Sequence, residues 1–347
     1  MYIKKILLII TTLGLLAGGW FAYYVYNAVF SPNTRFDEEK VTLNISTGTN
    51  ARELKEIMAP YVEDLNTFLR IADKKGYLQS IKPGRFILKK GANNNEIINI
   101  LRSKNEPIRV NFNNQERLED LAGRIAMQIE ADSLSLLTAF KDPNFLTQHQ
   151  FNQKNALAMY LPNSYEFFWN TSATGFRDRM LKEYQRFWND QRIKKANALG
   201  LKPVEVSTVA SIVQKETAKV DERPRVAGVY LNRLKDDWKL EADPTVIFAI
   251  KERTQQWDTV IKRVLFKDLQ LDSPYNTYKY MGLPPGLISM PDISSIDAVL
   301  NSENHDYYFF VADVQNFGYH KFAKNLRQHI NNRKQYIQWI NKQKILR

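Results

Sequence analysis

The sequence contains no cysteine among its 347 residues. This absence excludes a disulfide framework, a thiol nucleophile, a zinc ribbon, an iron–sulfur cluster and a lipidated N-terminal cysteine. Histidine is also scarce, and the four histidines form no H-x-H or H-E-x-x-H pattern. The sequence therefore predicts no metal site. The four are His149, His305, His320 and His329.

The composition is that of a folded protein with an excess of positive charge. Apolar residues make up 44% and aromatic residues 12% of the chain, which is too apolar for a disordered tail. At roughly 100 to 200 residues per domain, the length predicts two or three domains. The 49 Lys and Arg against 37 Asp and Glu give a net charge of +12. This excess indicates an anionic partner, such as nucleic acid, membrane headgroups or an acidic polymer.

One long apolar run lies near the N-terminus. No charged residue occurs between Lys5 and Arg35, and residues 6–30 exceed the roughly 20 residues that a helix needs to cross a bilayer. Bulky aromatic residues at 20–26 resemble an interfacial belt and disfavour the alternative, a cleaved signal peptide. We therefore expect a single-pass transmembrane helix at 6–30, a cytoplasmic tail at 1–5, and the rest of the chain outside the cytoplasm.

The residues after this run predict a polar linker at 31–40 and a small α+β module at 41–105. Hydrophobic alternation and turn residues predict a strand at 41–45, a helix from Ala51, a strand at 86–88 and a helix capped by Asn95.

A connecting α+β subdomain is expected at 106–158, and a larger mixed α/β domain at 159–347. The patterns predict a strand at 108–112, a helix over 118–129, an aromatic-rich loop at 160–169, and a helical segment at 177–199 that Gly200 ends. The expected fold class is α+β.

A glutamate on an apolar helical stripe is the leading catalytic candidate. Pro203 suits the start of a helix, and Glu216 follows Val209, Ile212 and Val213 at spacings of three and four, with Val220 extending the stripe. Burial would raise the pKa of this carboxyl from about 4.3 toward 6–7, the range useful for a general acid. In the alternative interpretation Glu216 lies at the edge of the stripe and pairs with Arg223 or Arg225.

Two rigid loops follow that helix, at 273–278 (Ser-Pro-Tyr-Asn-Thr-Tyr) and 282–286 (Gly-Leu-Pro-Pro-Gly). They combine hydroxyls, an amide and aromatic rings, a mixture that carbohydrate sites use to read sugar hydroxyls and cover sugar faces. The alternative is that each loop only reverses the chain.

Taken in order, these segments resemble the MltG-like (YceG-like) endolytic murein transglycosylase family. The resemblance is strongest in 210–217 (Ala-Ser-Ile-Val-Gln-Lys-Glu-Thr), 242–245 (Ala-Asp-Pro-Thr), 273–277 and 282–286, and it extends to 161–165 and 318–322. It implies a LysM-like module at about 41–105 and a catalytic transglycosylase domain at 159–347.

The resemblance assigns the catalytic role to Glu216. It also implies substrate binding by a set of polar and aromatic residues, with no cofactor and no metal. These residues are Tyr165, Asp243, Thr245, Ser273, Tyr275, Asn276, Thr277 and His320. The sequence departs from the family pattern at Gln214, where relatives often carry a glutamate, and at Met290 and 113–115.

The family's activity implies cleavage of the MurNAc–GlcNAc β-1,4 bond inside nascent glycan strands, leaving 1,6-anhydro-MurNAc ends. The resemblance also implies contact with peptidoglycan synthases of the elongation machinery. One alternative is a hydrolytic muramidase that uses Glu216 and Asp243; another is a non-catalytic glycan-binding scaffold for synthases. A nucleic-acid partner is disfavoured because the basic residues form no stripe interleaved with aromatic residues.

The C-terminal segment carries much of the positive charge. Residues 315–347 include eight Lys and Arg and no acidic residue, and Leu326, Ile330, Ile337 and Ile340 give them an apolar side. This pattern predicts a basic amphipathic helix that faces an anionic membrane surface or the carboxylates of peptide stems and wall polymers. A merely solvated helix is the alternative.

Overall fold

The computed structural model describes residues 2–342, so Lys344 and Arg347 of the basic C-terminal segment lie outside the described residues. Contacts divide the chain into two compact units. The N-terminal unit comprises Met1–Val110, Gln128–Ala131 and Tyr165–Ser172; the C-terminal unit comprises Asn111–Met127, Asp132–Ser164 and Ala173–Arg347. Helices and short strands occur in both units, which confirms the expected mixed α+β class.

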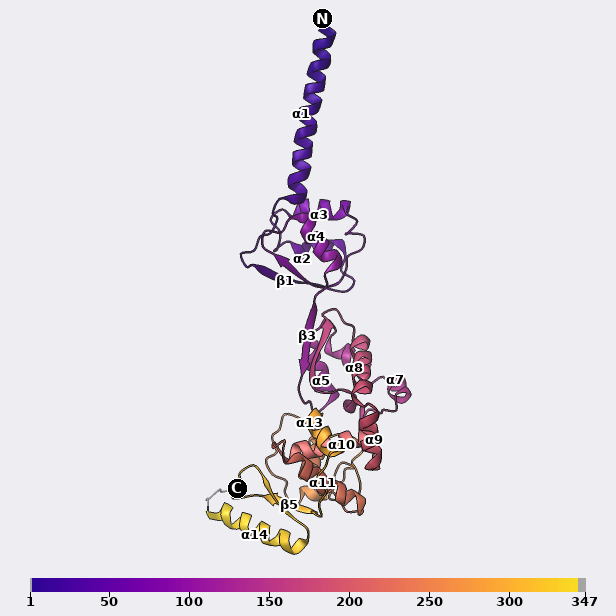
Figure 1. Ribbon diagram of the computed structural model, residues 1–347, viewed down its shortest axis with the longest axis vertical. Coiled ribbons are helices and arrows are strands. Elements are labelled where there is room, and N and C mark those ends of the chain that lie inside the picture. The colour runs from indigo at the N-terminus through magenta and orange to yellow at the C-terminus, as the bar shows by residue number, and fades with distance from the viewer. Residues whose placement is uncertain (1, 343–347) are drawn as a thin grey trace. The chain divides into compact units, whose positions relative to one another are not determined.

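The N-terminal unit begins with α1 (Tyr2–Phe30), drawn in indigo in Figure 1. Of the helices in residues 2–342, α1 is the one long and apolar enough to cross a membrane, and none of its side chains is buried. It starts earlier than the predicted 6–30. Its last turn is attached to the module, because the Asn94 side-chain amide donates to the Ala28 carbonyl oxygen at 2.8 Å.

The module in this unit is built around the antiparallel pair β1 (Lys40–Ile45) and β2 (Gly84–Lys89), in which Leu43 lies opposite Phe86. Alternating side chains of β1 and β2 are buried, as the sequence predicts. The helices α2 (Ala51–Met58), α3 (Leu65–Lys74) and α4 (Asn94–Ser103) complete its hydrophobic core.

The cap of α4 is Asn93, and the prediction of Asn95 is wrong. The Asn93 side chain accepts from the Glu96 backbone N–H at 2.9 Å, and the Glu96 carboxylate accepts from the Asn93 N–H at 3.0 Å. This capping box requires the glutamate three residues after the cap, so the helix begins at Asn94.

The remaining elements are mostly helical. Strand β3 (Pro107–Phe112) pairs with β4 (Asn163–Phe168), and β5 (Phe309–Ala312) pairs with β6 (His320–Ala323). The helices are α5 (Leu118–Ala126), α6 (Ser133–Phe140), α7 (Pro143–Gln148), α8 (Ala173–Phe187), α9 (Asp190–Ala198), α10 (Pro203–Glu216), α11 (Arg223–Lys235), α12 (Asp243–Thr254), α13 (Ile293–Leu300) and α14 (Leu326–Lys342), with 3₁₀ turns η1 (Ala156–Met159) and η2 (Asp268–Gln270).

Three expected boundaries change. The segment 160–169 is not all loop, because β4 begins directly after Pro162. The segment 177–199 is two helices, because the Asn189 side chain accepts from the Arg192 N–H and starts α9. Helix α5 ends at Ala126, short of 129. Gly200 follows α9 with a φ of 70°, as expected of a residue that ends a helix.

Helix α10 is the centre of the core of the C-terminal unit. All its side chains from Val206 to Val213 are buried, and it packs against α9, α11, α12 and α13. Helix α14, yellow in Figure 1, lies beside β5 and β6 in this same unit. The packing around α10 therefore fixes the position of this helix, including its last turn.

Candidate active site

Glu216 is the last residue of α10. Val209, Ile212 and Val213, which precede it on the same face, are fully buried, as the stripe predicts. Thr217 leaves the helix with extended dihedral angles, so Val220 does not continue the stripe and is 56% exposed. The stripe thus ends at the glutamate, whose side chain is partly exposed beyond a packed helix.

Glu216 lines a cavity of about 500 Å³, a size typical of small-ligand sites. Four aromatic rings share this lining with charged and apolar residues from α11, α12, β5 and α14. The lining residues are Glu216, Tyr230, Arg233, Leu240, Glu241, Asp243, Tyr278, Phe309, Phe310, Leu326, His329, Ile330 and Arg333. Aromatic rings and neutral hydroxyl donors close to a carboxyl are the mixture that a sugar site needs.

The Glu216 carboxyl is held by Tyr230, whose hydroxyl donates to Oε1 at 2.7 Å. Burial raises the pKa of Glu216 to about 7, and the negative charge of Asp243 raises it too; the Tyr230 hydrogen bond and Arg233 oppose them. A carboxyl that titrates near neutrality can both give and take a proton there.

The expected alternative pairing of Glu216 with an arginine is not observed. Arg223 donates to the Ser294 hydroxyl at 2.8 Å, and Arg225 pairs with Glu303 at 2.8 Å. Glu216 is therefore a cavity carboxyl and not half of an ion pair with either residue.

Asp243 is one of two further carboxylates on the cavity lining, with Glu241. It is the first residue of α12, and its Oδ1 accepts from the Tyr278 hydroxyl at 2.6 Å. The sequence predicts Asp243 as a binding residue, and the structure brings it to the same cavity as Glu216.

Arg233 connects the walls of this cavity. Its side chain is 9% exposed, and Nε donates to the Tyr308 carbonyl oxygen at 2.8 Å, just before β5. One terminal nitrogen donates to the carbonyls of Lys239 and Leu240 at 3.2 and 2.8 Å, and it lies 3.3 Å from Glu241 Oε2. One guanidinium thus ties α11 to the segment before α12 and to the start of β5.

Four of the predicted binding residues do not line this cavity. Their side chains form hydrogen bonds that hold the 273–278 loop in place. The Thr245 and Thr277 hydroxyls lie 2.8 Å apart, and Thr277 also accepts from the Ala242 N–H. The Asn276 amide donates to the carbonyls of Leu269 and Leu271 at 2.9 and 2.8 Å. Ser273 accepts from the Tyr275 N–H at 3.2 Å. These bonds fix the loop that carries Tyr278, so direct binding by Thr245, Ser273, Asn276 and Thr277 stays a prediction.

Three other predicted residues lie elsewhere. Tyr275 lines a second cavity. His320 is the first residue of β6, and its Nδ1 lies 2.8 Å from the carboxylate of buried Glu222. Tyr165 is on β4 in the N-terminal unit. Binding roles for Tyr165, Tyr275 and His320 also stay predictions.

The sequence did not single out Tyr230 or Tyr278 as individual site residues, and it did not place the C-terminal helix α14 at the cavity of Glu216. Leu326, His329, Ile330 and Arg333 of α14 share this cavity with Glu216, although the basic segment is distant from Glu216 in sequence. The amphipathic pattern predicted the helix, but no sequence signal indicated which surface it covers.

Comparison with known proteins agrees with the resemblance noted in the sequence. An endolytic murein transglycosylase of Bacillus subtilis is 28% identical, over 93% of this chain and 91% of its own length. One of Streptococcus pneumoniae serotype 2 is 27% identical over 92% of this chain, which spans 63% of that relative. A crystal structure of a YceG-like protein from Listeria monocytogenes is 26% identical with a TM-score of 0.56, covering 85% of this chain and 99% of that one. The model of the YceG-like family matches residues 43–335, and the chain therefore belongs to this family.

Proposed function

We propose that this chain is a membrane-anchored peptidoglycan lytic transglycosylase that cuts inside glycan strands, with Glu216 as its single acid and base. The observation that carries the proposal is the Glu216 carboxyl, which lies in an aromatic-lined cavity with a pKa raised by burial to about 7. The similarity to proteins named endolytic murein transglycosylase supports the substrate.

The reaction requires one carboxyl and no activated water. Protonated Glu216 gives its proton to the glycosidic oxygen between MurNAc and GlcNAc as the bond from that oxygen to the MurNAc anomeric carbon breaks. The MurNAc 6-hydroxyl oxygen then bonds to the anomeric carbon, and its proton passes to the Glu216 carboxylate. The products are a free GlcNAc 4-hydroxyl, a 1,6-anhydro-MurNAc end and protonated Glu216. Intramolecular attack supplies the nucleophile at high effective concentration.

Three other residues of the cavity have supporting roles in this proposal. Tyr230 orients the Glu216 carboxyl through its 2.7 Å hydrogen bond, and Asp243 keeps the neighbouring field negative, which favours the protonated acid. Arg333 of α14 supplies a cation at the rim for the carboxylates of the substrate. This gives the basic helix a binding role at the active site.

The proposed cellular location of the enzyme is based on α1. Its 29 residues exceed the length of a membrane span, and the aromatic residues near its end are typical of an interface. We propose a single-pass anchor in the cytoplasmic membrane, with the cavity on the outer side. The module at 41–105 is proposed to bind glycan as a LysM-like domain, and synthases of the elongation machinery are proposed partners.

The products of digestion test this function. When the full chain is incubated with isolated glycan strands, we expect mass spectrometry to find 1,6-anhydro-MurNAc ends at internal cuts. A hydrolytic muramidase that used Asp243 as a second carboxylate would leave reducing ends, one water heavier. A non-catalytic scaffold would bind strands and leave their length unchanged. Either of these two results would reject the proposed reaction.

The pH dependence of cleavage tests the role of the cavity charges. Because Glu216 must start protonated, we expect kcat/KM to be level below pH 7 and to fall about tenfold per unit above it. Tyr230→Phe removes a hydrogen bond that favours the carboxylate, so the falling limb moves to higher pH. Asp243→Asn removes a negative neighbour, so the limb moves to lower pH. Shifts in the same direction for both variants would contradict this assignment.

A further inference from the structure

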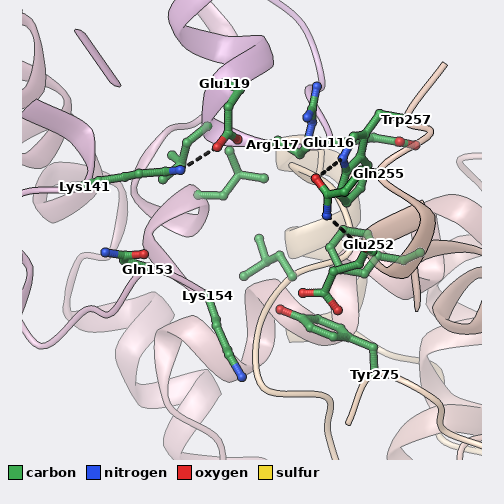
Figure 2. Close-up of a pocket in the computed structure, with 14 residues that line it drawn as sticks. Glu116, Arg117, Glu119, Lys141, Gln153, Lys154, Glu252, Gln255, Trp257 and Tyr275 are labelled. Atoms are coloured by element: carbon green, nitrogen blue, oxygen red, sulfur yellow. Dashed lines mark hydrogen bonds and ion pairs between the residues drawn. The ribbon is translucent and has the colours of Figure 1, made fainter. Parts of the chain in front are cut away.

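A second cavity lies on the other end of α12, in the same unit as the first. It has a volume of about 290 Å³, and its apolar wall is formed by Leu157, Phe248, Trp257, Tyr275 and Leu287. Figure 2 shows the Trp257 and Tyr275 rings with several charged side chains around this space. The cavity is amphiphilic, which suits a ligand with both apolar and charged parts.

Most of the charges in this cavity are already paired inside the protein. Glu116 accepts from Lys215 and from Lys251, each at 2.9 Å, and Glu119 pairs with Lys141. Arg117 pairs with Asp120 and places its guanidinium 4.6 Å from the centre of the Trp257 ring. These groups build the wall and have little capacity left for a ligand.

Two opposite charges on this lining are not paired. Within residues 2–342, the side chains of Glu252 and Lys154 make no hydrogen bond and no ion pair. They are nevertheless close enough for Lys154 to lower the pKa of Glu252, against the larger opposing effect of burial. Figure 2 shows the Glu252 carboxylate beside the Tyr275 ring and Lys154 across the cavity from it. A carboxylate and an ammonium that line one cavity without forming an ion pair can each bind an opposite charge of one ligand.

Two loops noted in the sequence supply this cavity. Tyr275 belongs to the 273–278 loop, and Leu287 follows the 282–286 loop. Gly286 lies against the backbone of Lys154, where a β-carbon would come within 2.0 Å of the Lys154 carbonyl oxygen. Only glycine allows this approach, which brings the segment of Lys154 into the cavity wall.

We propose that this cavity binds the peptide stem of the glycan strand, with Glu252 receiving a free side-chain amine of the peptide and Lys154 receiving a peptide carboxylate. The proposal rests on the proposed function for its substrate class, and it adds a site remote from the cleaved bond. The aromatic and aliphatic wall covers the methyl and methylene groups between the two charges.

The spacing of the two cavities allows one substrate to occupy both. Asp243 lines the first cavity and Glu252 the second, and a helical rise of about 1.5 Å per residue separates them by roughly 14 Å along α12. Five extended residues reach about 17 Å. Lys215 adds a second connection, because it pairs with Glu116 of the second cavity and adjoins Glu216 of the first.

Calorimetric titration of the full chain in detergent tests this site. The probe is a synthetic stem pentapeptide, Ala-D-isoGlu-Lys-D-Ala-D-Ala, with matched versions in which the lysine amine is acetylated or the C-terminus is amidated. We expect each modification to weaken binding to the wild-type chain by about tenfold or more, since each removes a charged contact. We expect acetylation to have no further effect on Glu252→Gln, and amidation to have none on Lys154→Gln.

Matched controls remove one charge of each sign outside both cavities. Asp237→Asn and Lys262→Gln change exposed residues that line neither cavity, and they should bind all three peptides as the wild type does. Absence of pentapeptide binding, or equal sensitivity of the controls, would overturn the proposal. Loss of both modification effects in the two cavity variants, with unchanged thermal midpoints, would support it.

A cleavage assay separates this proposal from the proposed function. With stem-bearing strands, Glu252→Gln and Lys154→Gln should raise KM by about tenfold, and with strands stripped of stems they should behave as the wild type. Glu216→Gln should still bind the pentapeptide. If the wild-type chain bound the peptide selectively and cut no strand, the proposed reaction would be rejected and the stem-binding site would be supported. If the chain cut strands but showed no charge-selective binding of the peptide, the stem-binding site would be rejected and the proposed reaction would be supported.

Discussion

We expect Glu216→Gln to lower the rate of strand cleavage by about 10²–10⁴-fold, which is the usual contribution of a general acid. Glutamine has the shape of protonated glutamate, and its oxygen can still accept from the Tyr230 hydroxyl, so the cavity should keep its form. The variant cannot donate the proton to the leaving oxygen. Release of 1,6-anhydro products, quantified by mass spectrometry, measures the loss.

The matched control for this variant is Glu303→Gln. Glu303 pairs with Arg225 and is partly exposed, and surface ion pairs contribute little to stability or to a distant reaction. We expect Glu303→Gln to cut strands at the wild-type rate. Equal losses in the two variants, or full activity in folded Glu216→Gln, would remove Glu216 from the mechanism.

The stability of Glu216→Gln provides an independent measurement of the carboxyl. Burial raises the pKa of Glu216 from 4.5 to about 7, so the folded protein binds this proton more tightly than the unfolded chain. The stability gained by the wild type is fully present below pH 4.5 and is lost as the pH rises through 7. Glutamine does not titrate. The difference in thermal midpoint, variant minus wild type, should therefore increase between pH 4.5 and 7.

The position of Glu216 could be predicted because it depends on local pattern. Helical spacing places a side chain on the same face as its neighbours three and four residues away, and Val209, Ile212 and Val213 are buried as that rule requires. The rule failed at Val220 because periodicity does not report where a helix ends. Thr217 takes extended dihedral angles although the next residue, Ala218, is neither glycine nor proline.

The partners of Glu216 could not be predicted because they depend on tertiary packing. Tyr230 reaches the carboxyl from the next helix, and α14 reaches the cavity from the end of the chain. Tertiary packing also explains why some predicted binding residues do not line the cavity. Asn276 and Thr277 have side chains that suit a sugar site, yet buried backbone groups of the loop use their hydrogen bonds first.

Arg233→Met is expected to lower the free energy of unfolding by about 3–5 kcal/mol, the range for removing one partner from a buried charged network. Methionine keeps much of the apolar volume but none of the donors. The Tyr308 and Leu240 carbonyls, which now accept from Arg233 at 2.8 Å, would be left without this partner. Unfolding of the wild type and the variant by denaturant, followed by tryptophan fluorescence, measures the difference in free energy of unfolding.

Arg225→Met is the matched control, because it removes the same side chain from the same helix. Arg225 is 44% exposed and forms an ion pair with Glu303, so its loss should cost no more than about 1 kcal/mol. Arg233→Lys distinguishes charge from geometry: one ammonium keeps the charge but cannot reproduce donors aimed at both Tyr308 and Leu240. It should therefore lie between Met and the wild type. If Arg233→Lys were as stable as the wild type, the charge alone would hold the cavity walls together, and the directed hydrogen bonds would not.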